Sequence, residues 1–199
     1  MRVLLFLLIF SQLLMGVDQA TFSNIKVASG SGCPNGTVGS TLSPDGTTLS
    51  VLFDSFFINL NGGKKERQVL DCILALDVQA PQGKRVVIRS ADIRGYIGTG
   101  AKTHSQVSRR FVLIGAGAVK NGGLKVKNFN SDSDIDYFFD SSAKLTSKIC
   151  GGKSQLLIQM RLDAKTLNKE SGPNYTALDS LDLSSIAPDG GVELIDCKK

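Results

Sequence analysis

Hydrophobic and polar positions alternate most regularly along residues 68–78, QVLDCILALDV. In an extended chain, one side of this segment is wholly apolar and carries Leu70, Cys72, Leu74, Leu76 and Val78. The other side mixes apolar residues with Asp71 and Asp77. This period-two pattern is typical of a strand that covers a hydrophobic core on one side. We therefore expect the sulfur of Cys72 to point inward, where a second cysteine could attach a neighbouring segment to the sheet.

The same alternation, interrupted by turn residues, predicts roughly ten short strands. Besides 68–78, they are expected at 21–27, 37–42, 47–53, 56–61, 86–91, 104–114, 124–129, 154–162, 176–183 and 192–197. Residues 43–46, SPDG, predict a hairpin turn, because Pro presets one turn dihedral and Gly accepts a positive one. Arg94-Gly95-Tyr96 predicts a bend, and residues 165–175 predict an exposed loop.

No segment has the periodicity of an amphipathic helix, so the sequence predicts an all-β fold. Bulky Leu and Phe on the inward sides of the strands need an opposing layer, which favours a two-sheet antiparallel β-sandwich over a barrel. We expect residues 21–199 to form one such domain, stapled by two disulfides.

Residues 1–20 have the features of a signal peptide. Arg2 precedes an apolar run at 3–10 that is too short to span a bilayer comfortably. Cleavage is expected between residues 16 and 20, with an uncleaved membrane anchor as the alternative. No later apolar segment is long enough to cross a membrane. The sequence therefore predicts a secreted, extracellular protein, or a periplasmic one in a Gram-negative bacterium.

The four cysteines, Cys33, Cys72, Cys150 and Cys197, are widely spaced and form no CxxC pair. With His104 as the single histidine, they do not complete a plausible zinc site. Disulfides are the natural interpretation in an exported protein, with free reactive thiols as the alternative. Three connectivities are open. We favour Cys33–Cys72 and Cys150–Cys197, because pairing neighbours in sequence keeps each bridge within one half of the domain.

Composition argues against nucleic acid as a partner. The net charge is +5, but the basic residues occur as small groups, such as Arg109-Arg110, that are not interleaved with aromatic residues. The chain has no Trp and three Tyr, Tyr96, Tyr137 and Tyr175, so it offers few aromatic rings for stacking on a sugar.

Asp132, Asp134 and Asp136 alternate within a polar tract and are the candidate ligands for Ca²⁺. However, Tyr137 follows them where an EF-hand loop requires Gly, and no Glu stands at the twelfth position. A solvated acidic loop without a cofactor is therefore the preferred interpretation.

The sequence contains no catalytic motif that we can identify. His104 is the only histidine base available to a serine nucleophile, and there is no G-x-S-x-G elbow. Asp92, Asp179 and Asp182 could serve a glycosidase, but their spacing does not pair them. A secreted, carboxylate-dependent, glycosidase-like hydrolase is thus the alternative function.

A contact surface for an extracellular or envelope ligand is expected on two loops, residues 92–100 and 128–140, because loops on a rigid sandwich usually carry recognition. Within them, Asp92, Arg94 and Tyr96 are the candidate ligand-binding residues. Arg94 could form a local ion pair with Asp92 or present its guanidinium to an anionic ligand. Asn35 and Asn174 each begin a glycosylation sequon, which matters if the host glycosylates secreted proteins.

Several short motifs occur in a defined order: residues 29–37 (SGSGCPNGT), 43–46 (SPDG), 71–72 (DC), 81–83 (PQG), 91–96 (ADIRGY), 150–151 (CG), 179–182 (DSLD) and Cys197. In this order they resemble the secreted four-cysteine family of fungi and bacteria known as domain of unknown function 4360, DUF4360, over essentially the whole mature chain. The resemblance implies export, a β-rich domain and two disulfides, but no established activity or catalytic residues. The family pattern has an aromatic-rich stretch before the third cysteine and a Trp near the last. This chain instead has residues 145–149 (LTSKI) and 194–196 (LID) there.

These observations favour a non-catalytic binding, adhesion or envelope-associated module of unknown partner.

Overall fold

The computed structural model describes residues 19–139, 144–186 and 191–197. The predicted signal peptide lies almost entirely outside this range, and its cleavage site within residues 16–20 falls at the boundary. The described residues form strands, turns and bends. Among them there is no helix that could cross a bilayer.

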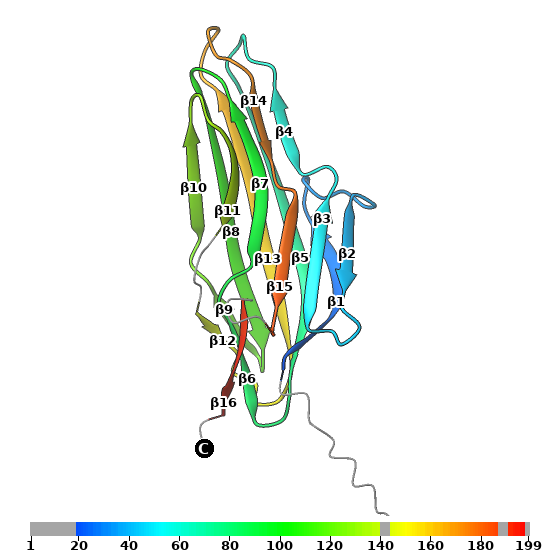
Figure 1. Cartoon of the computed structure of the whole chain (residues 1–199). Helices are drawn as coiled ribbons and strands as arrows, with labels where there is room; N and C mark the ends of the chain where they lie inside the picture. The colour runs from blue at the N-terminus through cyan, green and yellow to red at the C-terminus, as the bar shows by residue number, and fades with distance from the viewer. Residues whose placement is uncertain (1–18, 140–143, 187–190, 198–199) are drawn as a thin grey trace, which may run out of the picture.

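Two large antiparallel sheets form the body of the molecule (Figure 1). The first contains, in spatial order, β1 (Thr21–Ser29), β5 (Glu66–Ala80), β13 (Gly152–Thr166), β8 (Thr103–Gly115) and β10 (Lys125–Asn130), with β9 (Ala118–Asn121) also paired to β8. The second contains β2 (Val38–Leu42), β3 (Thr48–Phe53), β15 (Ser180–Ser184), β7 (Asp92–Thr99), β14 (Asn174–Ala177) and β4 (Phe57–Leu60), with β11 (Asp134–Phe139) also paired to β7. The predicted all-β, two-sheet antiparallel sandwich is therefore confirmed.

A small third sheet, which the sequence did not predict, lies at the end of the sandwich where the chain terminates (Figure 1). It consists of β12 (Leu145–Thr146), β6 (Lys84–Ile88) and β16 (Val192–Asp196).

The core lies between the two large sheets and is centred on β5 and β13. These strands pair without a bulge from Glu66 opposite Thr166 to Ala80 opposite Gly152. The inward side chains of β5, including Leu74 and Leu76, are buried as the alternation predicted. Ile93 and Ile97 of β7 face them within the same hydrophobic cluster. Each such side chain contributes about 1.5–3 kcal/mol when fully buried, so packing between the sheets is the main stabilising term.

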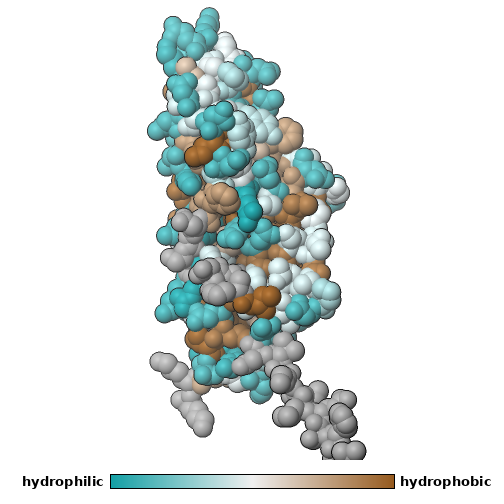
Figure 2. Space-filling view, viewed as in Figure 1, coloured by the Kyte–Doolittle hydropathy of each residue, from teal (hydrophilic) through white to brown (hydrophobic). Residues whose placement is uncertain are grey.

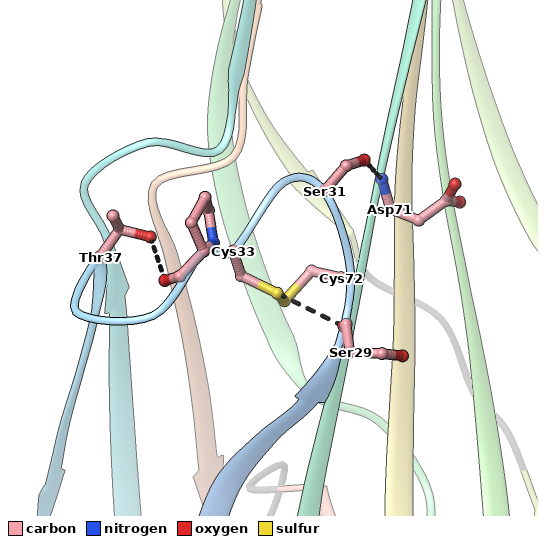
Figure 3. Close-up of a disulfide and its surroundings, with 7 residues drawn as sticks. Ser29, Ser31, Cys33, Thr37, Asp71 and Cys72 are labelled. Atoms are coloured by element: carbon pink, nitrogen blue, oxygen red, sulfur yellow. Dashed lines mark hydrogen bonds between the residues drawn. A yellow bond between two sulfur atoms is a disulfide. The ribbon is translucent and has the colours of Figure 1, made fainter.

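The Cys33–Cys72 disulfide fastens the segment after β1 across β5 (Figure 3). Cys72 is fully buried, so its sulfur points inward as predicted. Gly30 has a φ of +136°, and a Cβ there would lie 2.2 Å from the carbonyl oxygen of Asp71. Only glycine allows this close approach of the two backbones. Two hydrogen bonds hold the two backbones together: the Gly32 amide donates to the Asp71 carbonyl oxygen at 2.8 Å, and the Asp71 amide donates to Ser31 Oγ at 3.3 Å.

The Cys150–Cys197 disulfide joins the segment before β13 to the segment after β16, with the two Cα atoms 5.9 Å apart. Next to it, the Cys197 amide donates to the carbonyl of Gly83, and the Gly151 amide donates to the carbonyl of Lys84. The bridge therefore holds the third sheet at the end of the sandwich. Both bridges have the connectivity that the sequence favoured, and on the chain-entropy model each stabilises the fold by about 4 kcal/mol.

Two segments that were predicted as a bend and a loop are in fact paired strands. Residues 94–96 lie inside β7, and most of the polar tract from Asp132 onward becomes β11, which pairs with β7 from Asp134 opposite Gly98 to Phe139 opposite Ile93. The prediction of a bend is wrong, because Gly95 is not a turn residue. A Cβ at Gly95 would lie 2.1 Å from the carbonyl oxygen of Ala177 and 2.4 Å from the hydroxyl of Tyr137. The glycine is required by this close packing rather than by a change in chain direction.

Gly95→Ala tests this packing. We expect the substitution to lower the free energy of unfolding by about 1–3 kcal/mol, because the added methyl group forces apart β7, β14 and the Tyr137 ring. Gly39→Ala in β2 is the matched control: a Cβ there meets no atom within 4 Å, and the loss of glycine from a strand should be neutral or stabilising. Urea denaturation measures both. Equal stabilities for the two variants would contradict the packing described for Gly95.

Candidate functional site

The three candidate ligand-binding residues lie on one face of β7. Asp92, Arg94 and Tyr96 alternate with residues that are buried against the core, so all three side chains point away from it. Their surface is the outer face of the seven-stranded sheet, which is the side of the molecule seen in Figure 2. The structure therefore places these residues on a rigid sheet rather than on the loop that the sequence predicted.

Three aromatic rings form a row across neighbouring strands of this face. Phe57 of β4 and Tyr175 of β14 have ring centroids 5.8 Å apart at an interplanar angle of 25°. The rings of Tyr175 and Tyr96 follow at 6.0 Å. We call Phe57, Tyr175 and Tyr96 the aromatic row. Phe57 is 43% exposed and the two tyrosines are half-buried, so the row is accessible from outside.

Local sequence explains how the row is assembled. Gly98 stands opposite Tyr175 in the β7–β14 register, and it carries no side chain that would separate the two strands' rings. A Cβ at Gly98 would lie 3.1 Å from the ring of Tyr96, so that ring lies over the glycine. On the other side of β14, Asn59 is opposite Tyr175, and Phe57 is opposite Ala177.

Carboxylates border the row on the β11 side. Tyr96 donates its hydroxyl proton to Asp134 at 2.8 Å. This hydrogen bond to a carboxylate favours the neutral phenol and is the main cause that raises the pKa of Tyr96. Asp136 is directly opposite Tyr96 in the β7–β11 register. One end of the row thus combines an aromatic face with hydrogen-bond acceptors.

Arg94 does not form the local ion pair considered from the sequence. Among the described residues no ion pair joins it to Asp92, and its guanidinium lies 5.5 Å from the centroid of the Phe138 ring. Phe138 is opposite Arg94 on β11 and is 56% exposed. The contact is a cation–π interaction at an exposed site, worth about 0.5–1 kcal/mol.

Further carboxylates lie on the same face along β15. Asp182 is directly opposite Asp92, and it accepts a hydrogen bond from Ser50 of β3. At the link between β14 and β15, burial raises the pKa of Asp179, and the negative charge of Asp136 adds to that effect. In a chain of net charge +5, this face is therefore locally acidic.

The candidate calcium ligands are not brought together. Asp132 lies in the turn before β11 with a φ of 60°, whereas Asp134 and Asp136 lie on the strand, with Asp134 bonded to Tyr96. Within residues 19–139, 144–186 and 191–197, no group of three or more His, Cys, Asp or Glu side chains could hold a metal ion.

The outer face of the six-stranded sheet is different in character. An open cavity of about 490 Å³ is lined there by charged and polar side chains such as Arg110 and Gln159 together with apolar ones such as Ile73 and Leu124. Asp71 lies 3.6 Å from Arg161 at its edge. His104 is on β8, where its Nδ1 lies 3.1 Å from the amide oxygen of Asn130.

Sequence reasoning missed two members of the aromatic row. Tyr175 was assigned to an exposed loop and Phe57 to a strand without a functional role. No local signal marked these two residues, because the register that places Phe57 and Tyr96 beside Tyr175 comes from pairing between distant segments.

Comparison with known proteins places the chain among proteins without assigned activity. The profile of the family described as domain of unknown function (DUF4360) matches residues 19–186. A curated relative, an uncharacterized secreted protein of Arthroderma benhamiae, is 30% identical over an alignment of 149 residues that covers 70% of this chain. The aligned region spans 58% of the length of that relative. The secreted relative and the two disulfides confirm the prediction of an extracellular protein.

Two solved structures overlap loosely with the sandwich. One is TmCBM61 in complex with β-1,4-galactotriose, with a TM-score of 0.25 and 10% identity over 89% of this chain and 91% of that one. The other is a family 11 carbohydrate-binding module from Clostridium thermocellum in complex with a β-1,3-1,4-mixed-linked tetrasaccharide, with a TM-score of 0.22 and 10% identity over 83% and 88%. At these TM-scores neither overlap relates residues of the two chains to one another.

The Tyr96–Asp134 hydrogen bond can be tested by titration. Asp134→Asn removes the negative charge that favours the neutral phenol, so the pKa of Tyr96 should fall toward its ordinary value. NMR of protein labelled with ¹³C on the tyrosine rings measures each phenol separately. Asp132→Asn, which changes a carboxylate in the neighbouring turn, should leave the Tyr96 titration unchanged. A Tyr96 pKa that is the same in wild type and Asp134→Asn would contradict the contact.

Proposed function

We propose that this chain, which belongs to the DUF4360 family of domains of unknown function, is an extracellular, non-catalytic module that binds carbohydrate on the outer face of the seven-stranded sheet. The observation that carries the proposal is the aromatic row, in which three partly exposed rings lie side by side on a surface that solvent reaches.

The chemistry of the row suits a sugar ring. A pyranose presents an apolar face of C–H groups and an edge of hydroxyl groups. Phe57 and Tyr175 offer flat apolar surfaces, and Tyr96 combines an aromatic ring with a hydroxyl group. Side chains with an apolar body and a polar tip are common in binding sites. Rings with few rotatable bonds also lose little conformational entropy on binding.

The polar groups around the row favour a neutral ligand. Asp134 and Asp136 can accept hydrogen bonds from sugar hydroxyls, and such bonds to ionised acceptors are stronger than neutral ones. The additional carboxylates of Asp92 and Asp182 on the same face disfavour a polyanion through like-charge repulsion. Neutral polysaccharides therefore fit this surface better than uronate-rich ones.

The scaffold supports a preformed site. The row is built on paired strands, and the strand register fixes the relative positions of its three rings. An extended row on an open face is suited to a chain-like ligand that lies across several strands. Little reorganisation on binding is then required, which preserves affinity.

The rival hydrolase requires two carboxylates on either side of the scissile bond. Asp92 and Asp182 are in register, but both project from the open sheet face, and neither lines the cavity formed on the opposite sheet. Release of reducing sugar ends on incubation with a polysaccharide is the result that would favour hydrolysis over binding.

Isothermal titration calorimetry against soluble neutral polysaccharides, such as β-glucan, galactan and mannan, with polygalacturonate as the acidic counterpart, tests the proposal. For the polysaccharide that binds wild type, Tyr175→Ala should weaken affinity by about tenfold or more, since loss of a central aromatic anchor costs on the order of 2 kcal/mol. Val119→Ala, which truncates a 58% exposed side chain on the other sheet, is the control and should bind as wild type does.

Thermal denaturation of each variant separates binding from folding. Unchanged affinity in a folded Tyr175→Ala protein would contradict the proposal and leave the row as cross-strand packing alone. Preferential binding of polygalacturonate would contradict the assignment of a neutral ligand.

A further inference from the structure

The chain carries two glycosylation sequons, Asn35-Gly36-Thr37 and Asn174-Tyr175-Thr176, which are equivalent as motifs. The structure separates them. We infer that Asn35 is an acceptor site for an N-linked glycan, and that Asn174 is a structural residue whose amide is never modified in the folded protein.

Asn35 lies in an exposed, well-defined turn. The Thr37 amide donates to the carbonyl of Pro34 at 3.1 Å, and Gly36 between them has a φ of +84°, so Asn35 occupies the first central position of the turn. Its side chain is exposed, and among the described residues it takes part in no hydrogen bond. A Cβ built at Gly36 meets no atom within 4 Å, so the space around the turn is open.

The position of the turn also suits a bulky group. Cys33, two residues before Asn35, is held by its disulfide to β5, and the Thr37 carbonyl accepts a hydrogen bond from the Asp54 amide at 2.9 Å. The turn is therefore anchored at both ends while its tip faces solvent. The chain continues from it into β2, an edge strand whose residues are largely exposed. A glycan on Asn35 displaces no packed residue.

Asn174 has the opposite environment, because its side chain is fully buried and every hydrogen-bonding group on it is used. Its Oδ1 accepts from Ser105 Oγ at 2.7 Å and from Thr176 Oγ1 at 3.1 Å. Its Nδ2 donates to the carbonyls of His104 at 3.1 Å and Lys165 at 3.2 Å.

Three of these four bonds, those to Ser105, His104 and Lys165, tie β14 of one sheet to β8 and β13 of the other, and the fourth is internal to β14. The sequon threonine takes part in the same network, since Thr176 Oγ1 also lies 2.7 Å from Ser105 Oγ. A sugar on Nδ2 would replace a donated hydrogen and occupy the space between the sheets. Burial of an unsatisfied polar group there is destabilising, in addition to any steric conflict.

The modification at Asn35 is the transfer of an oligosaccharide to the side-chain amide. The side-chain nitrogen forms a bond to the anomeric carbon of a polyprenyl-diphosphate-linked oligosaccharide. The bond from that carbon to the diphosphate oxygen breaks, the lipid diphosphate leaves with the bonding electrons, and the amide nitrogen loses one proton. In secretory pathways the transfer precedes folding. A chain modified at Asn174 could then not reach this fold, so the two sites should differ in the folded, secreted protein.

The test uses the full chain secreted from a yeast host, which supplies the transferase and the lipid-linked donor. The secreted protein is treated with a peptide-N-glycosidase in H₂¹⁸O, which converts each formerly glycosylated Asn to ¹⁸O-labelled Asp, and the peptides are identified by mass spectrometry. We expect the label at Asn35 and unmodified Asn174. Label at Asn174 in the secreted fraction, or its absence from Asn35, would overturn the inference.

Two variants sharpen the result. Thr37→Val removes the first sequon without changing Asn35 and should abolish the mass of the glycan in the secreted protein. Thr176→Val removes the second sequon and should leave that mass unchanged. If Thr176→Val is not secreted because its inter-sheet network is broken, peptide mapping of the wild type still decides between the two sites. A glycan mass that is lost in Thr176→Val and kept in Thr37→Val would contradict the assignment.

Discussion

The pairing of β5 with β13 is the interaction on which the rest of the structure depends. The two strands are in unbroken antiparallel register along their whole length, and β13 pairs on its other side with β8, again in continuous register. The inward side chains of these strands supply much of the core on which the seven-stranded sheet packs. Cys72 on β5 also anchors the segment that leads to β2 and β3. A slip of one residue in this pairing would turn every inward side chain outward, so the apolar side of β5 fixes the whole sandwich.

Features determined by local alternation could be predicted from the sequence. The period-two pattern around Cys72 identified the central strand, and the inward bulky residues indicated a second layer. A β-strand that buries one face leaves a local alternation of apolar and polar residues in the sequence. The disulfide connectivity followed from a weaker argument, separation along the chain, and the structure supplies its actual basis in the close backbone approach of Gly30 to Asp71.

Features determined by long-range packing could not be predicted. Gly95 looked like a turn residue, although it lies in a strand because Tyr137 and the Ala177 carbonyl leave no room for a Cβ. The polar tract before Tyr137 looked like a loop, although its outward carboxylates belong to β11. The aromatic row depends on the registers of β4, β14 and β7, which come from distant parts of the sequence. Such registers cannot be deduced from local composition. The chain also has no Trp, so its sequence offered little indication of an aromatic surface.

The central claim is that carbohydrate binds on the aromatic row, and the three tyrosines of the chain allow a direct test. Tyr96 and Tyr175 belong to the row, whereas Tyr137 is buried beneath the sheet with its hydroxyl donated to the Ala177 carbonyl at 2.8 Å. We would record NMR spectra of protein labelled with ¹³C on the tyrosine rings while adding a soluble neutral polysaccharide. The account predicts shifts of the Tyr96 and Tyr175 signals that saturate with ligand, and an unchanged Tyr137 signal. Saturable binding that leaves the Tyr96 and Tyr175 signals in place would contradict it.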